Sequence, residues 1–158
     1  MLLKNSSIVS GLSFGLTSGV ITTLGLLVGL EAGTGSTKIV LSGILTIAVA
    51  DAFSDALGIH MSEESKNETS SKEVWQATIA TLLAKFLFAI SFVVPILYLP
   101  VSAAVTASII WGLFLILTLS YIMAKKQKEN PLKPMAEHFI IAVFVIIITH
   151  YIGHWIGK

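Results

Sequence analysis

Two carboxylates interrupt an apolar run in the stretch Ala48-Val49-Ala50-Asp51-Ala52-Phe53-Ser54-Asp55-Ala56-Leu57-Gly58-Ile59-His60-Met61-Ser62. Asp51 and Asp55 are four residues apart, so on a helix their side chains lie one turn apart on the same face. A single Asp at the centre of a membrane-spanning helix costs roughly 2.5–3.5 kcal/mol. Two in one span therefore indicate a site for a cation, a proton or a counter-charge inside a membrane protein.

The composition is that of an integral membrane protein. Of 158 residues, 54% are hydrophobic and 12% charged, and the mean hydropathy is +0.87, whereas soluble domains carry about 25% charged residues. The net charge of +1 and the lack of Arg or of a basic aromatic patch give no indication of nucleic-acid binding. Cysteine is absent, which excludes disulfides, thiolate metal sites and thiol catalysis. No phosphate-binding loop, nucleophile elbow or zinc-protease motif is present, so we expect no enzyme.

Five apolar segments are long enough to cross a bilayer, which takes about 20 residues. We expect an all-α fold with a single transmembrane domain over residues 1–158 and spans at about 8–30, 39–61, 74–99, 102–124 and 135–156. With the N-terminus inside, the inner segments carry Lys4, Lys66, Lys72, Lys125, Lys126, Lys128 and Lys133, and the outer ones carry Lys38 and Lys158. The positive-inside rule then predicts an N-in, C-out multi-pass protein, in the cell membrane if the source is a prokaryote.

Lys85 lies inside the third span, at a depth similar to that of Asp51 and Asp55. One interpretation is a structural ion pair, and the other is a counter-ion or coupling residue in a cation or proton path. Two carboxylates against one Lys leave an excess acid inside the membrane, which favours the second interpretation. The sequence leaves open which of the two carboxylates Lys85 contacts.

Other polar residues lie near span ends. Glu63 and Glu64 follow the Asp-bearing span on its inner side, where they either belong to an ordinary solvated loop or recruit a divalent cation toward that span. His60 and Met61 close that span, and an imidazole with a thioether suits a transition metal.

A possible secondary metal site lies in the last span. His150 and His154 have the four-residue spacing that places two imidazoles on one helical face. The alternative is an ordinary polar helix end at the membrane interface. We therefore name His60, His150 and His154 as possible secondary ligands.

Three segments resemble the vacuolar iron transporter family of five-span proteins. Ser18-Gly19-Val20-Ile21-Thr22-Thr23-Leu24, followed by Gly29, resembles the family's Asp-Gly-(Ile/Leu/Val)-Val-Thr-Thr run and later Gly. Ala52-Phe53-Ser54-Asp55-Ala56-Leu57-Gly58-Ile59-His60-Met61-Ser62 resembles its Ala-x-Ser-Met-Ala-x-Gly-Glu-Tyr-Leu-Ser run. Thr149-His150-Tyr151-Ile152-Gly153-His154-Trp155-Ile156-Gly157 resembles its closing Thr-Tyr-Leu-Ile-Gly-x-Leu-Leu-Gly run.

The chain also departs from the family pattern. Ser18 stands where the family has an Asp taken to line the ion path, Asp55 stands at the position of a metal-binding Met, and Ile59 replaces a Glu. The linker over residues 62–73 leaves no room for the cytoplasmic metal-binding domain that some members insert there. The chain thus resembles a divergent member of the family in which several site residues are replaced.

The resemblance implies a homodimer with an ion path near its two-fold axis, lined by the first two spans. The face formed by Gly11, Gly15 and Gly19 permits close approach of two copies of the first span. Dimerisation would gather four carboxylates around one axis, a hard-oxygen site suited to a divalent cation or to proton exchange.

Together these features predict a divalent metal transporter in the lipid bilayer that exports Fe²⁺ or Mn²⁺ from the cytoplasm in exchange for protons. Asp55 and Asp51 would bind the metal with help from Ser18 or Thr22, and Met61, Glu63 and Glu64 would line the path. No permanently bound cofactor is expected. The alternatives are a non-transporting scaffold of the same fold with a structural Asp–Lys pair, and a transporter of another cationic solute.

Overall fold

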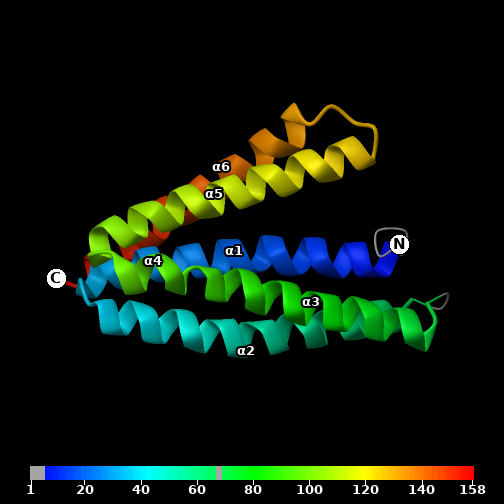
Figure 1. Ribbon diagram of the computed structural model, residues 1–158, viewed down its shortest axis with the longest axis horizontal. Helices are drawn as coiled ribbons and strands as arrows, with labels where there is room; N and C mark the ends of the chain where they lie inside the picture. The colour runs from blue at the N-terminus through cyan, green and yellow to red at the C-terminus, as the bar shows by residue number, and fades with distance from the viewer. Residues whose placement is uncertain (1–5, 67–68) are drawn as a thin grey trace.

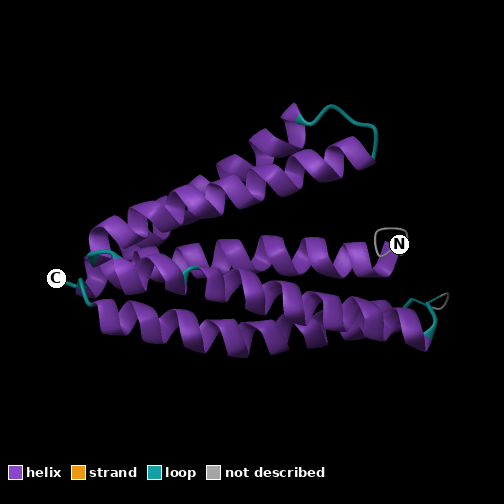
Figure 2. Cartoon of the chain, viewed as in Figure 1, coloured by secondary structure: helices purple, strands orange, loops and turns teal. Residues whose placement is uncertain are grey.

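The computed structural model describes residues 6–66 and 69–158, so Lys4 of the predicted inner segments lies outside the described residues. All regular secondary structure in this part of the chain is helical, as the sequence predicts (Figure 2). The helices are α1 (Ser6–Thr34), α2 (Thr37–Glu64), α3 (Ser71–Ser91), α4 (Val93–Tyr98), α5 (Val101–Lys126) and α6 (Leu132–Ile156). Five segments are long and apolar enough to cross a membrane, because α3 and α4 together form one of them. The prediction of a five-span all-α membrane protein is confirmed.

The third span is broken near its end. It was expected as one helix over 74–99, but α3 ends at Ser91 and α4 begins at Val93. The cause is Pro95, which has no N–H to donate to the carbonyl of Ser91 and whose ring clashes with that carbonyl. The indole of Trp111 on α5 donates a hydrogen bond of 3.1 Å to the hydroxyl of Ser91 at this break.

α1 is the central helix and packs against α2, α3, α5 and α6 (Figure 1). It contributes Val20, Leu24, Leu27 and Val28 to the hydrophobic core. The α2–α3 and α5–α6 connections lie at the end of the bundle where α1 begins, which we call the α2–α3 end. The turn between α1 and α2 lies at the opposite end, the α1–α2 end, together with the last turn of α6 (Figure 1). α5 and α6 diverge from α1 and α3 toward the α2–α3 end.

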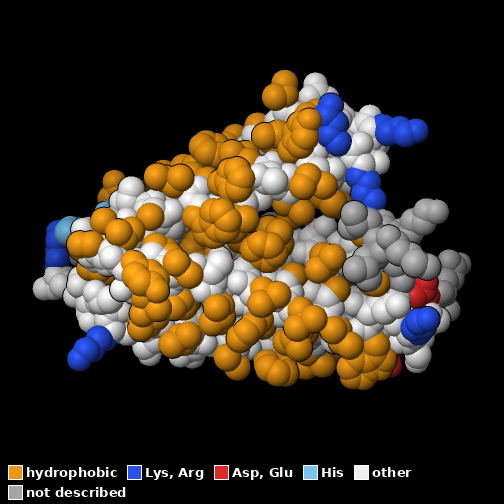
Figure 3. Space-filling model, in the orientation of Figure 1, with side chains coloured by type: hydrophobic (Ala, Val, Ile, Leu, Met, Phe, Trp, Pro, Cys, Tyr) orange, Lys and Arg blue, Asp and Glu red, His pale blue; other side chains and the backbone are white. Residues whose placement is uncertain are grey.

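The outer surface matches lipid contact. On the face shown in Figure 3, hydrophobic side chains cover the middle of the molecule and charged side chains lie toward its two ends. Large apolar side chains are exposed on every spanning helix, among them Phe53, Leu87, Phe114 and Phe144. Such a belt is unfavourable in water, so the chain is a multi-pass integral membrane protein.

The glycines at the start of α1 let α3 approach closely. A Cβ at Gly11 would lie 2.4 Å from the carbonyl oxygen of Ala77, and one at Gly15 would lie 2.6 Å from that of Thr81. The Thr81 hydroxyl also donates to the carbonyl oxygen of Gly11 at 3.2 Å. Because α3 of the same chain occupies this face, the expectation that it pairs two copies of the first span is wrong.

A second run of glycines later in α1 contacts α6. A Cβ at Gly33 would lie 2.9 Å from the carbonyl oxygen of Gly153, and one at Gly157 would lie 2.3 Å from that of Gly33. Backbones this close form weak C–H···O contacts and strong dispersion contacts, which drive helix association in lipid. α1 thus uses one set of glycines for α3 and another for α6.

Candidate functional site

Lys85 extends from α3 into the space between α1 and α2, and only 1% of its surface is exposed. Gly19 of α1 makes room for it. A Cβ at Gly19 would lie 3.0 Å from the carbonyl oxygen of Lys85 and 3.2 Å from its Cγ. The glycine face of α1 therefore also allows the aliphatic stem of Lys85 to pack against the helix while Nζ continues toward α2.

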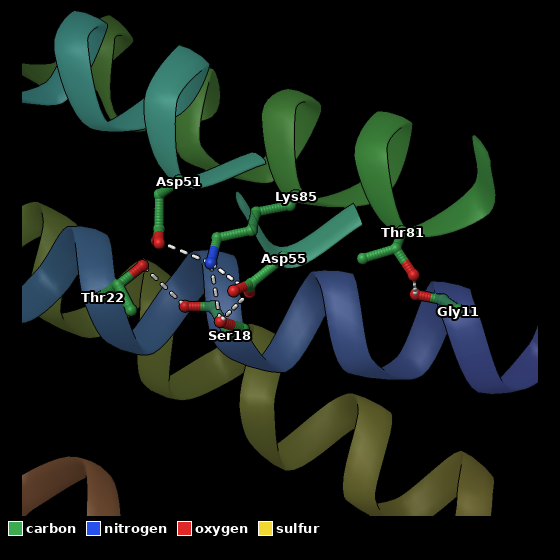
Figure 4. Close-up of polar contacts among 7 residues, drawn as sticks. All are labelled: Gly11, Ser18, Thr22, Asp51, Asp55, Thr81 and Lys85. Carbon is green, nitrogen blue, oxygen red and sulfur yellow. Dashed lines mark hydrogen bonds and ion pairs between the residues drawn. The ribbon is translucent and has the colours of Figure 1, made fainter. Parts of the chain in front are cut away.

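Three side chains surround the ammonium of Lys85 (Figure 4). Nζ lies 2.6 Å from Oδ2 of Asp51, forms an ion pair with Oδ2 of Asp55, and donates a hydrogen bond of 2.8 Å to Oγ of Ser18. Ser18 in turn donates to Oδ2 of Asp55 at 2.6 Å. The question left open by the sequence is answered here, because Lys85 contacts both carboxylates.

The two carboxylates are held differently. Asp55 accepts hydrogen bonds from both Lys85 and Ser18. Asp51 has the ion-pair contact with Lys85, but Nζ and Oδ2 are not aligned as a hydrogen bond, and this buried oxygen accepts none from any described residue. A carboxylate has about four lone-pair positions, so Asp51 keeps most of its capacity to accept.

The cluster lies at mid-depth. Asp51 is at the middle of the span Thr37–Glu64, Lys85 is at the middle of Ser71–Tyr98, and Ser18 is near the middle of α1. A span of 28 residues is about 42 Å long, so the cluster is well removed from both membrane surfaces. Charges at this depth are costly and in membrane proteins mark ion paths, proton relays or buried pairs.

The carboxylates are not sealed from the surface. The side chain of Asp51 is 25% exposed and that of Asp55 is 20% exposed. Asp51 lies in an open groove of about 640 Å³ between α1 and α2, lined by Leu26, Leu30, Ile39, Ser42, Gly43, Thr46, Ile47, Ala50, Asp51 and Ser54. The groove follows one face of α2 from Ile39, near the α1–α2 end, to the mid-depth cluster.

The hydroxyl groups of Ser42, Thr46 and Ser54 in the groove were not predicted as site residues from the sequence. All three are exposed and line the same groove as Asp51. Their spacing could have indicated them. Ser42, Thr46 and Ser54 fall in a four-residue repeat with Ala50, so they lie along one face of the helix that carries Asp51.

Thr22 lies one turn along α1 from Ser18, and its hydroxyl donates to the backbone and not to either carboxylate. Its hydroxyl donates to the carbonyl oxygen of Ser18 at 2.8 Å, and its side chain lines a second groove between α1 and α6. Of the two predicted helpers on the first span, Ser18 is therefore the one in contact with Asp55.

The predicted residues at the end of α2 lie apart from the cluster. Glu63, eight residues beyond Asp55 on the same helix, is about 12 Å away along the axis, and its carboxylate pairs with Lys66 at 2.6 Å. Glu64 and Met61 are exposed at the α2–α3 end. These side chains lie apart from the cluster, and none of them lines the groove that reaches Asp51.

The histidines have other partners. Nδ1 of His60 lies 3.0 Å from the hydroxyl of Thr78, and its ring meets Trp75 edge-on with centroids 4.8 Å apart. The rings of His150 and His154 are parallel, with centroids 6.4 Å apart, and both are exposed near the α1–α2 end. The structure thus does not bring His60 to the other two.

Over residues 6–66 and 69–158, no group of three or more His, Asp or Glu side chains is close enough together to hold a metal ion. One copy of the chain brings together two carboxylates, one hydroxyl and one ammonium. With all three ionised, this cluster carries one excess negative charge. What it can do chemically is hold a cation next to, or in place of, the ammonium.

The sequence has no match among models of known protein families, and no curated protein matches it.

Proposed function

We propose that this protein is a cation transporter whose mid-membrane site is the cluster of Asp51, Lys85 and Asp55, with Fe²⁺ or Mn²⁺ as the transported ion. The observation that carries the proposal is the second carboxylate. A structural pair needs one acid for one base, yet Lys85 contacts two acids at the depth where charge is most costly. Partial exposure of both carboxylates gives a cation a way to reach them.

A homodimer completes this proposal. A charged groove open at mid-depth would face lipid in a single copy, so a second copy covering the α1–α2 groove would remove an unfavourable contact. Two copies would bring four carboxylates and two ammonium groups to one region, an excess of two negative charges. One divalent ion neutralises that excess.

The resemblance to the vacuolar iron transporter family supports the choice of Fe²⁺ or Mn²⁺ and of export from the cytoplasm. Oxygen ligands from carboxylates and hydroxyls suit such ions better than soft ones. Because metal binding displaces protons from its ligands, protons moving the other way would use the same carboxylates. Glu63 and Glu64 would attract the cation at the α2–α3 end, which is the cytoplasmic end in the predicted orientation.

The test is Mn²⁺-dependent fluorescence quenching in proteoliposomes. Asp51→Asn and Asp55→Asn should each reduce the initial rate by about tenfold or more, because each removes one negative charge from the cluster and a loss of about 1.4 kcal/mol in binding is a tenfold change. Glu129→Gln removes a carboxylate from the exposed α5–α6 connection and should leave the rate unchanged. Wild-type rates in both Asp variants would overturn the site, and competition by an organic cation alone would point to a different solute.

A specific observation favours a second candidate, a membrane scaffold. The ammonium of Lys85 contacts three oxygen-bearing side chains and is fully enclosed, as in a structural pair. On this account the variant combining Lys85→Met with Asp55→Leu keeps a stable dimer, and the wild type shows no cation flux. Flux by the wild type would exclude the scaffold.

A further inference from the structure

We infer that the two carboxylates have separate tasks: Asp55, together with Ser18, holds the ammonium of Lys85 permanently, and Asp51 receives the transported cation. This division rests on the proposed transport function and deepens it. Four residues of spacing make the two acids equivalent in sequence, but their surroundings in the structure differ.

Asp55 belongs to a closed ring of hydrogen bonds. Lys85 donates to Ser18 at 2.8 Å, Ser18 donates to Asp55 at 2.6 Å, and Lys85 donates to Asp55 directly. The three hydrogen bonds link three side chains pairwise, so each bond supports the geometry of the other two (Figure 4). A cation at Asp55 would have to break two hydrogen bonds of this ring.

Asp51 lies outside the ring. Its one described polar contact is the 2.6 Å approach of Nζ to Oδ2, without hydrogen-bond alignment. It is also the acid that lines the groove between α1 and α2, next to Ser54 and within a run of side chains that reaches toward the α1–α2 end. Asp51 therefore combines spare acceptor capacity with a place in the groove, whereas Asp55, although also partly exposed, does not line that groove.

The cost of binding differs for the same reason. A cation at Asp51 replaces one contact of Lys85, while the ammonium keeps Asp55 and Ser18. The buried charge of Lys85 is then never left without a partner, which is the condition that makes breaking a buried pair so unfavourable. Displacement of Lys85 from Asp55 would remove its hydrogen-bonded carboxylate and leave only the less well aligned one.

This division also predicts what the site selects. The groove that Asp51 lines also offers hydroxyl oxygens from Ser54 and Thr46. Neither thioether nor imidazole side chains line it. A hard divalent ion such as Mn²⁺ fits an oxygen-only site, whereas Cu⁺ does not.

The first experiment compares Mn²⁺ binding by Asp51→Asn with that by the wild type, using the full chain in detergent and the loss of the electron paramagnetic resonance signal of free Mn²⁺. The ring of Lys85, Asp55 and Ser18 stays intact in this variant, so we expect an unfolding temperature within about two degrees of wild type. Mn²⁺ affinity should fall by about tenfold or more. Wild-type affinity in Asp51→Asn would overturn the inference.

Two double variants provide a matched comparison. Lys85→Met with Asp55→Asn and Lys85→Met with Asp51→Asn have the same composition and net charge, and each retains one carboxylate. The first keeps Asp51 in the groove with its hydroxyl groups and should bind Mn²⁺. In the second, Asp55 is released from Lys85 but does not line the groove, so Mn²⁺ affinity should be lower by about tenfold or more. Equal affinity, or tighter binding by the second, contradicts the division of tasks. If the wild type binds Mn²⁺ and the two double variants bind it equally, only this inference is overturned. If none of the proteins binds Mn²⁺, the proposed transport function is overturned as well.

Discussion

At the scale of single residues, the molecule depends on one ammonium group in an apolar interior. Lys85 is 1% exposed, and its charge is balanced by the two acids of α2 and by the hydroxyl of Ser18. Gly19 provides the space in which its stem lies. Removing the ammonium leaves two carboxylates one turn apart with no cation between them.

Lys85→Met should therefore lower the free energy of unfolding by about 3–5 kcal/mol, the typical cost of breaking a buried pair by removing one partner. Guanidinium or thermal unfolding in detergent micelles measures this change. Added Mn²⁺ should raise the stability of this variant more than that of the wild type, because the metal takes the place of the missing charge.

The matched control is Lys72→Met, at the exposed start of α3, which should change the stability by less than about 0.5 kcal/mol. Equal stability of Lys85→Met and wild type would mean that the ammonium of Lys85 is not needed to stabilise the buried carboxylates of Asp51 and Asp55.

At the scale of helices, glycine spacing determines which elements meet. The first glycines of α1 receive α3 and the later ones receive α6, in both cases at backbone contact distance. A side chain added at these positions meets backbone atoms, which cannot rotate away as a flexible side chain can. The helices must then separate along their length.

Gly15→Ala should destabilise the protein by about 1–3 kcal/mol, the cost of overpacking a well-packed contact, because its Cβ would lie 2.6 Å from the carbonyl oxygen of Thr81. Gly58→Ala makes the same chemical change in α2, where no atom lies within 4 Å of the new Cβ. It should stabilise the helix by about 0.5–1 kcal/mol. Thermal unfolding of both variants checks the pair, and a loss of stability at Gly58 equal to that at Gly15 would contradict the packing account.

Sequence reasoning found the spans but not their partners. The five spans follow from the length that lipid requires, but the third was expected as one helix, and the break between Ser91 and Val93 was not predicted although Pro95 explains it. The glycine run of residues 11, 15 and 19 correctly indicated close helix contact, but small residues do not specify which helix approaches. Self-pairing and contact with α3 are equally compatible with that spacing, and the structure selects α3.

The candidate site shows the same limit. The sequence placed Lys85 at the depth of the two acids, and the structure adds that Nζ reaches both because they lie one turn apart. The sequence alone could not distinguish the roles of Asp51 and Asp55. Their difference comes from Ser18 on α1 and from an open groove, and both depend on how the helices pack together.

At the scale of the whole molecule, an odd number of membrane spans places the two ends of the chain at opposite ends of the bundle. α1 begins and α6 ends at opposite ends of the bundle (Figure 1). Most lysines belong to the α2–α3 end, so the positive-inside rule predicts that this end faces the cytoplasm.

The lack of native cysteine allows a direct test of this orientation. A membrane-impermeant maleimide added to intact cells should label Lys158→Cys, and it should label Lys128→Cys only after permeabilisation. These two positions lie at opposite ends of the molecule and are both exposed. The reverse pattern would show an inverted protein and would reverse the proposed direction of transport.

The central claim is that the mid-membrane cluster binds the transported cation. The most direct measurement is an anomalous-scattering map of the protein crystallised with Mn²⁺. We expect one manganese peak per two copies at the carboxylates of Asp51, with Nζ of Lys85 still on Asp55. A map with no peak at the cluster, or with manganese only at Glu63 and Glu64 or at the His150–His154 pair, would contradict the account.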